Sequence, residues 1–414
     1  MEMERKKGYG FFWGVMAGIL ITLVVVVAGY FAGQKVVTYQ YANVQKESEQ
    51  LVEEADEHIV NGDFVQKADT IENIIAERYY LDEVELESLR EGAYEGIVEA
   101  LGDIYSVYYT PEEAAELFQE SEGIYYGIGA YVEMDTVSGY VKVTGLIEGT
   151  PAEEAGLQPG DIFYKADGED LAGLDTTQVV HRIKGEEGTS VHLTMVRDNT
   201  EFEVDVVRRK IESPTVESEI LEDGIGYIQL IEFDDVTVAQ FEKALQEIKE
   251  ADCKGMILDL RGNPGGNLGA VLDISDMLLE EGLILYTEDK QGNRQSYNSD
   301  ASCEWDKPIV VLVDGNSASA AEVLSGALKD HGKATLVGTT TFGKGIVQSV
   351  ITLKDGSAIK LTVSAYYTPS GTNIHGTGIE PDVTVEFDGE AYYGPEAFDN
   401  QLDKAKEVLK ELIQ

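Results

Sequence analysis

From about Gly224 onward, apolar runs of strand length alternate with amphipathic stretches of helical period, and no other feature restricts the fold as strongly. The apolar runs are GIGYIQLIEF, KGMILDL, PIVVLVDG and KATLVGTT. Continuously apolar strands separated by helices are typical of a largely parallel sheet with helices on both faces. The sequence therefore predicts an α/β core over residues 211–390, which includes a β-hairpin (IVQSVITL and AIKLTVSAYY around KDGS), and an amphipathic helix over residues 391–414.

The turn after the third apolar run, NSASAAE, places Ser319 at the start of a predicted helix. Free backbone N–H groups at a helix N-terminus stabilise a developing oxyanion, so a serine at this position is a candidate nucleophile. The spacing of Ser319 and Glu322 also fits a capping box, in which the serine has only a structural role. The motif alone leaves both interpretations open.

The loop DLRGNPGGN follows the second apolar run and spans Asp259–Asn267. Its two consecutive glycines let the backbone turn tightly and expose its amides. Such a loop at the carboxyl end of an α/β strand is a common place for a site, although an ordinary strand-to-helix turn is the alternative. An ordinary turn does not need Arg261, Asn263 and two glycines together.

The third motif, FGKGIVQ, holds Lys344 and, four positions later, Gln348. Even spacing places both side chains on one face of a strand. A lysine at the buried mouth of a site loses hydration, which lowers its pKa, and a neutral amine can then take the proton of a serine hydroxyl. Gln348 can hold the amine without adding charge. The alternative is a surface lysine beside a hairpin.

A nucleotide site and a histidine base are the alternatives to a site built from Ser319 and Lys344. The segment Gly338–Lys344 matches most of a P-loop, but Gly345 stands where a P-loop has the Ser or Thr that binds Mg²⁺, so a nucleotide site is not expected. His331 ends the helix that begins at Ser319, roughly 18 Å away along the axis, and cannot act as its base. His375, in a Gly-rich segment, stays an alternative base.

Residues 121–210 have a different character, with short alternating segments separated by turn residues and one embedded helix, TTQVVHRIKG. This pattern predicts a small, mostly β module. Its segment YYGIGAYV places Gly127, Ile128 and Gly129 at a turn that enters a strand. Amides at such a turn can bind a carboxylate beside a strand edge that accepts an extended peptide, whereas a plain β spacer is the alternative.

Together and in this order, these motifs resemble those of the carboxyl-terminal processing (tail-specific) serine protease family. GIGAYV with GTPAEEAGLQPGDIF resembles its PDZ domain, and DLRGNPGG, NSASAAE and FGKGIVQ resemble its three core motifs. The resemblance runs from Ala68 to Gln414. It implies a multidomain α+β protein with a PDZ-like β module and a crotonase/Clp-protease-like α/β peptidase core.

The resemblance also implies a serine endopeptidase with Ser319 as nucleophile, Lys344 as general base and Gln348 as the support of that base. It implies no metal and no organic cofactor. The residues implied to bind are Ala320 and Gly265 or Gly266 for the oxyanion, and Gly127, Ile128 and Gly129, with Arg182 and Lys184 nearby, for a peptide carboxylate. The implied partners are unfolded or C-terminally exposed protein substrates, and the helical terminal segments are implied to form a homodimer or higher oligomer.

One segment departs from the family pattern. In LGDIYSVYYTP, Ile104 stands where the family usually has a proline, which we interpret as a change in a helical support region that leaves the chemistry intact. Two rival functions remain: a catalytically silent PDZ adaptor that only binds tails, and an acyl-thioester enzyme on a similar core. The PDZ-like module argues against the second, and so does the charge-free apolar stretch from Gly8 to Gln34, which indicates export from the cytoplasm.

The N-terminus predicts a membrane anchor. Arg5, Lys6 and Lys7 precede a stretch from Gly8 to Gln34 that has no charged residue. Its core is long enough to cross a bilayer, and the basic residues place the N-terminus in the cytoplasm. A cleaved signal peptide would have a shorter apolar region. The sequence therefore predicts a cytoplasmic tail over residues 1–10, an anchor in the cell membrane over 11–33, a stalk over 34–67 and a helical region over 68–120. The catalytic part that follows is predicted to be extracytoplasmic.

Composition narrows the partners. The chain has 77 acidic and 31 basic residues, a net charge of −46, so it repels phosphate backbones and nucleic-acid binding is not expected. The same charge keeps the soluble part away from anionic headgroups. Cys253 and Cys303 have no metal-site spacing and are expected to be free thiols, with a disulfide as the alternative outside the cytoplasm.

Overall fold

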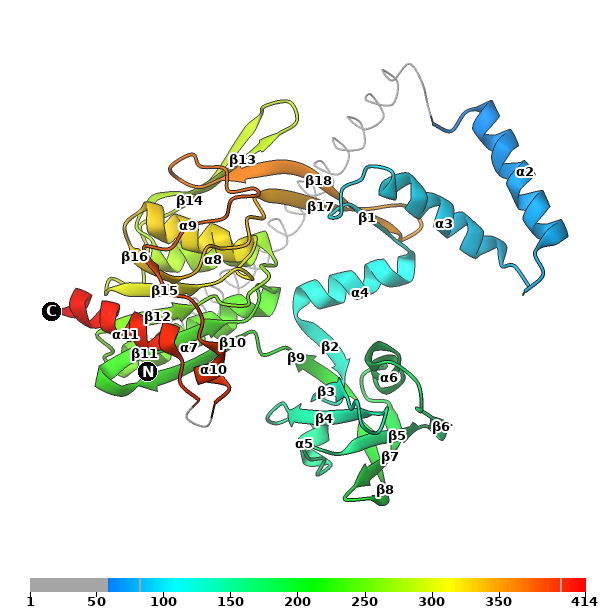
Figure 1. Ribbon diagram of the computed structural model, residues 1–414, viewed down its shortest axis with the longest axis horizontal. Coiled ribbons are helices and arrows are strands. Elements are labelled where there is room, and N and C mark those ends of the chain that lie inside the picture. Colours follow the sequence, from blue (N-terminus) through cyan, green and yellow to red (C-terminus); the bar gives the residue numbers. More distant parts are fainter. Residues whose placement is uncertain (1–58, 82, 395–396) are drawn as a thin grey trace, which may run out of the picture. The chain divides into compact units, whose positions relative to one another are not determined.

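The computed structural model describes residues 59–81, 83–394 and 397–414 (Figure 1). The predicted cytoplasmic tail, the predicted anchor and most of the predicted stalk lie outside the described residues. Within the described ranges, no helix is long and apolar enough to span a bilayer. The chain divides into two units, Met1–Leu89 and Arg90–Gln414.

The described part of the first unit is mainly helical. Helix α2 (Gly62–Arg78) begins at Asn61, whose side chain accepts a hydrogen bond from the Phe64 N–H at 3.0 Å. No residue of α2 is buried. Helix α3 (Leu86–Glu99) starts in this unit and continues into the second.

The segment that follows α3 combines a strand and a helix. Strand β1 (Val107–Tyr109) was not predicted, and it pairs antiparallel with β18 (Ala358–Tyr367). Helix α4 (Pro111–Glu122) begins with a capping box from Thr110 and proline in the first turn. The region around Ile104 is a turn between α3 and β1, so the interpretation of this segment as helical support is wrong.

The predicted β module is confirmed, with its own apolar core. Its main sheet has the order β3-β4-β5-β7-β8, with β6 beside β5, and β2 pairs with β9. The strands are β2 (Ile124–Gly127), β3 (Ala130–Met134), β4 (Val141–Leu146), β5 (Ile162–Ala166), β6 (Glu169–Asp170), β7 (Ser190–Arg197), β8 (Thr200–Val207) and β9 (Arg209–Glu212). The helices are α5 (Pro151–Glu154) and α6 (Thr176–Ile183).

The predicted α/β core is also confirmed. Its sheet has the order β10-β11-β12-β15-β16-β19, parallel except for β10. The strands are β10 (Val216–Leu221), β11 (Ile225–Leu230), β12 (Gly255–Asp259), β15 (Ile309–Val313), β16 (Ala334–Gly338) and β19 (Val383–Thr384). The helical elements are η1 (Glu222–Gly224), α7 (Asp235–Glu250), α8 (Leu268–Leu278), α9 (Ala320–Asp330), α10 (Gly389–Tyr392) and α11 (Asn400–Ile413).

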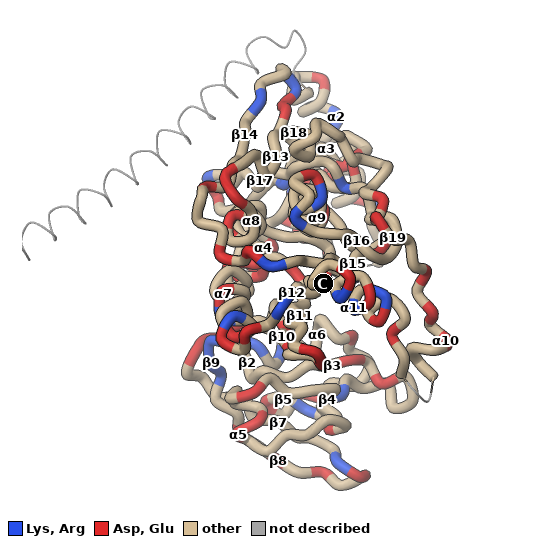
Figure 2. The backbone as a smooth tube through the Cα atoms, turned by 90° about the vertical axis from the view of Figure 1, so that its left-hand side faces the viewer, with Lys and Arg blue, Asp and Glu red and all other residues tan. Residues whose placement is uncertain are grey.

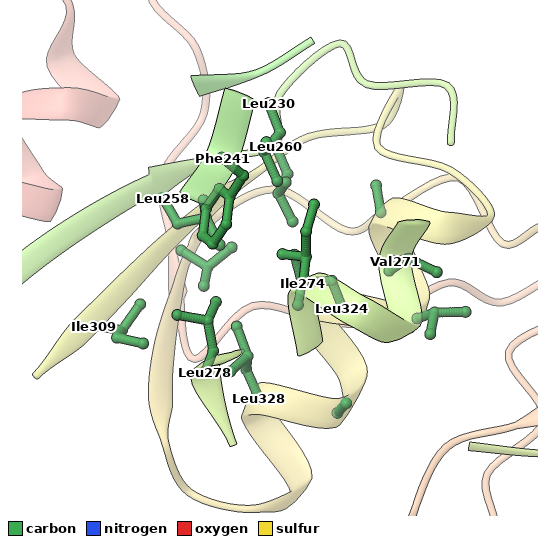
Figure 3. Packing of buried hydrophobic residues seen from close by; sticks show 14 of the residues in the cluster. Leu230, Phe241, Leu258, Leu260, Val271, Ile274, Leu278, Ile309, Leu324 and Leu328 are labelled. Carbon is green, nitrogen blue, oxygen red and sulfur yellow. The ribbon is translucent and has the colours of Figure 1, made fainter. Parts of the chain in front are cut away.

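Helices cover both faces of this sheet. Side chains of α7, α8 and α9 pack on one face, as Figure 3 shows for Phe241, Ile274 and Leu324 around Leu258. Ile257, which precedes Leu258 in β12, points to the other face and belongs to a cluster with Ala405 and Leu409 of α11. Each large side chain buried in this way contributes about 1.5–3 kcal/mol to folding.

A second sheet holds the predicted hairpin, β17 (Ile346–Thr352) with β18. Its order is β1-β18-β13-β14, with β17 along the other side of β18. Strands β13 (Gly282–Asp289) and β14 (Arg294–Ser299) form a further hairpin that was not predicted. The start of β17 carries Lys344 and Gln348 to the edge of the α/β core.

Charge is spread over the molecule. Figure 2 shows Asp and Glu positions on most of the labelled elements of both the β module and the core. Cys253 is buried and Cys303 partly buried, and both are free, as expected.

Candidate active site

A pocket of about 410 Å³ brings the three sequence motifs together. Its lining includes Ser319 and Ala320 from the start of α9, Gly266 from the loop after β12, and Lys344 and Gln348 from the β17 region. The first two motifs follow the carboxyl ends of β15 and β12, where sites of α/β sheets usually lie. The sheet topology therefore explains why residues far apart in the sequence meet here.

Ser319 has an unusual backbone conformation for a residue other than glycine, with φ 53° and ψ −113°. Such a conformation costs about 1–3 kcal/mol and needs support from its surroundings. The buried Tyr366 hydroxyl donates a hydrogen bond to the Ser319 carbonyl at 3.1 Å. Gly265 packs so closely that an added Cβ would lie 2.7 Å from the Ser319 Cβ. The strand-to-helix turn is thus held from two sides.

Glu322 is the residue whose importance the sequence did not reveal. The spacing of Ser319 and Glu322 is that of a capping box, but the Ser319 side chain accepts no hydrogen bond that would cap α9. Its fully buried carboxylate accepts four hydrogen bonds. Oε2 accepts from the Ser319 N–H at 3.0 Å and the Lys344 N–H at 2.8 Å, and Oε1 accepts from the Thr341 hydroxyl at 2.5 Å and the Gly343 N–H at 2.8 Å. One carboxylate therefore joins the backbones of both candidate catalytic residues.

We expect Glu322→Gln to destabilise the fold by about 3 kcal/mol, because an amide nitrogen would replace one acceptor and face hydrogen-bond donors in a buried place. Thermal and denaturant unfolding would measure the loss. Glu242→Gln, on an exposed position of α7, is the matched control and should change stability by no more than about 0.5 kcal/mol. Equal stability of the two variants would contradict the bridging role of Glu322.

Backbone amides suited to an oxyanion flank Ser319. The Ala320 and Gly266 N–H groups line the pocket and donate no hydrogen bond within the described part of the chain. The Gly265 N–H, in contrast, donates to the Asn263 side chain at 2.8 Å. An added Cβ at Gly266 would lie 2.1 Å from the Phe233 carbonyl oxygen, so only glycine fits there. Ala320 and Gly266 are thus the pair with unoccupied donors.

Lys344 is partly buried in this pocket. Burial, and next the positive charge of Lys360, lower the pKa of Lys344, while the charge of Glu322 acts against this shift. The Lys344 amine lies 5.0 Å from the centre of the Tyr105 ring. Within the described residues it forms no hydrogen bond with the Ser319 hydroxyl. The candidate base is therefore in the pocket, with its amine over the Tyr105 ring.

Gln348 also has another partner. Its side-chain amide donates a hydrogen bond to the Thr362 hydroxyl of β18 at 3.3 Å. Of the alternative bases, His375 is not among the residues that line the pocket, and His331 lies at the far end of α9, with its ring near the Leu283 carbonyl at 2.8 Å. Lys344 and Lys360 are the basic residues in the lining of this pocket.

The lining of the pocket also includes acidic residues. Glu120, Glu232 and Asp234 line it, and none of the three stood out in the sequence. Burial, and next the charge of Glu232, raise the pKa of Asp234 to about 7. The pocket thus combines Ser319 with two lysines and three carboxyl groups, one of them from α4.

The turn Gly127–Gly129 joins β2 to β3 in the β module. Gly129 has φ 83°, and an added Cβ would lie 2.4 Å from Thr150, so both conformation and space require glycine. Strand β3 pairs only with β4 among the described strands and has α6 beside it. A turn, a strand edge and a helix thus lie together, as a peptide-binding groove requires.

The two basic residues expected near a peptide carboxylate already have partners. Arg182 forms an ion pair with Glu169. The Lys184 amine lies 5.5 Å from the centre of the Tyr125 ring. In this structure the cationic groups of Arg182 and Lys184 therefore already contact other side chains of the β module.

Comparison with known proteins agrees with this arrangement. Peptidase family S41 matches residues 224–385, a PDZ domain matches 142–197, and the N-terminal domain of the activating protease CtpB matches 23–113. A carboxy-terminal-processing protease of Bartonella bacilliformis is 37% identical over 308 residues, which cover 72% of this chain and 70% of the relative. The carboxy-terminal processing protease CtpB of Bacillus subtilis is 36% identical over 313 residues, which cover 74% of this chain and 65% of that protein.

A solved structure, a putative S41 protease from Bacteroides fragilis, superposes with a TM-score of 0.52 at 18% identity and covers 83% of this chain and 97% of that one. This likeness shows the fold. The sequence relatives are more informative about the family, because their identity exceeds a third over most of both chains. The chain belongs to the carboxy-terminal processing proteases of peptidase family S41, which are serine-type peptidases.

Proposed function

We propose that this protease is an endopeptidase with Ser319 as nucleophile, Lys344 as general base and Gln348 as the support of that base. The observation that carries the proposal is the bridge between the two residues: both line one pocket, and the backbone N–H groups of both donate to the same oxygen of Glu322. A serine and a partly buried lysine held in this way match the requirements of nucleophilic catalysis.

In the proposed reaction, neutral Lys344 takes the proton of the Ser319 hydroxyl as the oxygen bonds to the substrate carbonyl carbon. The Ala320 and Gly266 amides donate to the resulting oxyanion. Lys344 then passes the proton to the leaving amine as the carbon–nitrogen bond breaks, and water hydrolyses the acyl-enzyme by the same route. In this structure the amine lies 5.0 Å from the centre of the Tyr105 ring, so a hydrogen bond between the Ser319 hydroxyl and the amine has to form before the first step.

The PDZ domain is proposed to select substrates by their C-terminal tails. An extended apolar tail would add as a strand to the edge of β3, and its carboxylate would meet the amides around Gly127, Ile128 and Gly129. The exposed edge of β3, with α6 beside it, supports this mode. Unfolded proteins and proteins with exposed tails are the substrates that such a groove admits.

Amidation of a substrate's C-terminus is expected to lower kcat/KM by about tenfold, because a hydrogen bond to a charged acceptor contributes about 1.5–3 kcal/mol. The comparison uses one disordered, apolar-tailed peptide with a free or amidated end, cleaved by the full chain. Acetylation of the peptide's N-terminus is the matched control and should leave the rate unchanged. Equal rates for the free and amidated ends would separate the PDZ domain from recognition.

The second candidate is a catalytically silent adaptor that binds tails through the same groove. The observation that keeps it open is that the Lys344 amine lies 5.0 Å from the centre of the Tyr105 ring and forms no hydrogen bond with Ser319 within the described residues. Incubation of the full chain with a disordered, apolar-tailed protein, followed by mass spectrometry, separates the two. Fragments establish the peptidase, whereas bound but intact substrate supports the adaptor. Membership of family S41 argues against the acyl-thioester alternative.

We further propose a cell-membrane protein with residues 11–33 as a single anchor, the N-terminus in the cytoplasm and the catalytic part outside. The support is the uncharged stretch behind Arg5, Lys6 and Lys7. Protease added to intact cells should remove the catalytic part, and its survival would contradict this orientation. The predicted domain limits, the homodimer or higher oligomer, and the crotonase/Clp-protease-like character of the core stay predictions.

A further inference from the structure

Tyr105 lies over the candidate base. The Lys344 amine is 5.0 Å from the centre of its ring, within the range of a cation–π contact. An aromatic face attracts an ammonium group and not a neutral amine. The contact therefore favours the protonated form of Lys344, which cannot accept the proton of Ser319.

The same segment is connected to Gln348. The Gln348 amide donates to the Thr362 hydroxyl at 3.3 Å, and the Thr362 N–H donates to the Ser106 hydroxyl oxygen at 3.2 Å. The Ser106 hydroxyl in turn donates to Asp103 at 2.6 Å. Hydrogen bonds from Ser106 and Thr362 lower the pKa of Asp103. The base and its proposed support are thus both linked to the segment Asp103–Ser106.

The segment is anchored at its C-terminal end. It continues into β1, which pairs with β18 at Val107↔Lys360, and the buried Tyr108 hydroxyl donates to Glu91 at 2.7 Å. Ile104, next to Tyr105, is 84% exposed. Tyr105 is only partly buried and belongs to none of the three apolar clusters of the described residues. Release of its ring from Lys344 would therefore not unpack a core.

We propose that Tyr105 is a positioning residue that holds Lys344 away from Ser319 in a resting arrangement, and that release of Tyr105 from Lys344 activates the peptidase. The inference rests on the proposed function, since it assumes that Lys344 is the base. It assigns a role to LGDIYSVYYTP, a segment that the sequence alone connects with no chemistry.

Other charged groups also act on Lys344. Lys360 of β18 and Glu322 of α9 act on it directly, and further titratable groups line the same pocket: Glu120, Glu232, Asp234 and Tyr366. All of them stay in place when only Tyr105 is changed. A shift in the titration midpoint of Lys344 that a Tyr105 variant causes therefore measures the effect of the Tyr105 ring.

The test compares the full chain with Tyr105→Leu, which keeps an apolar side chain but removes the ring face. We expect peptide cleavage at neutral pH to rise about three- to tenfold, and the acid limb of the pH profile of kcat/KM to move down by about half to one pH unit. Tyr105→Phe keeps the ring and should keep the wild-type midpoint. Ile104→Ala, on the exposed neighbour, is a control that should change neither quantity.

A second readout does not need peptidase activity. In a Ser319→Ala background, acetic anhydride labels neutral lysine amines, and mass spectrometry of the Lys344 peptide against pH gives its titration midpoint. Tyr105→Leu should lower this midpoint. An unchanged or raised midpoint, or a cleavage rate at or below wild type, would overturn the role of Tyr105. Persistent cleavage by Ser319→Ala alone would instead overturn the proposed function.

Discussion

Replacement of Ser319 by alanine is expected to lower peptide cleavage by at least about a thousandfold, because the variant has no oxygen that can form the acyl-enzyme. Residual cleavage would come from the oxyanion amides and substrate binding alone. The measurement uses the full chain with a disordered, apolar-tailed protein, and mass spectrometry of the fragments over time. The fragment masses also distinguish a single trim from processive cleavage.

The matched control for this variant is Ser349→Ala, an exposed serine of β17 outside the pocket lining, which should cleave as wild type does. Equal cleavage by Ser319→Ala and wild type would mean that Ser319 only begins a helix. Unfolding curves for both variants keep a loss of activity from being confused with a loss of folding.

Lys344→Arg should reduce cleavage by a similar factor although it keeps the positive charge, because a guanidinium group stays protonated and cannot act as a base.

The pH profile of the wild-type protease follows from the same requirement for a neutral amine. Burial lowers the pKa of Lys344, and the active form is the neutral amine. Activity is therefore present above that lowered pKa and is lost as the pH falls through it.

Lys354→Arg, in the exposed turn of the β17–β18 hairpin, is the matched control and should retain the wild-type rate. Full activity of Lys344→Arg would remove the lysine from the role of base, and His375→Ala would then be the variant to measure. An acid limb that stays unchanged in an active Lys344 variant would lead to the same conclusion.

Much of the fold followed from periodicity. The continuously apolar runs became the buried parallel strands β12 and β15, and helices cover both faces of their sheet. The motifs after these strands meet because parallel strands end at the same edge. The hairpin that carries Gln348 was also visible, as two alternating runs around a Gly-containing turn.

The missed features depend on contacts that no local pattern records. Glu322 looks like a capping residue in the sequence, but three of its four donors come from Thr341, Gly343 and Lys344. Strand β1 has three residues, too few for a period, and forms only because β18 offers its edge. Tyr105 lies two residues before β1, and its ring is near Lys344 because β1 pairs with β18. No pattern in the sequence indicates this contact.

The backbone of Ser319 has a consequence for how such a chain can change over generations. A positive φ with ψ near −113° is a conformation that glycine adopts at little cost and serine does not. Selection for thermal stability alone would therefore favour glycine at position 319 and remove the hydroxyl. A catalytically silent descendant of this protein would be expected to lose its serine early and to become more stable as it did so.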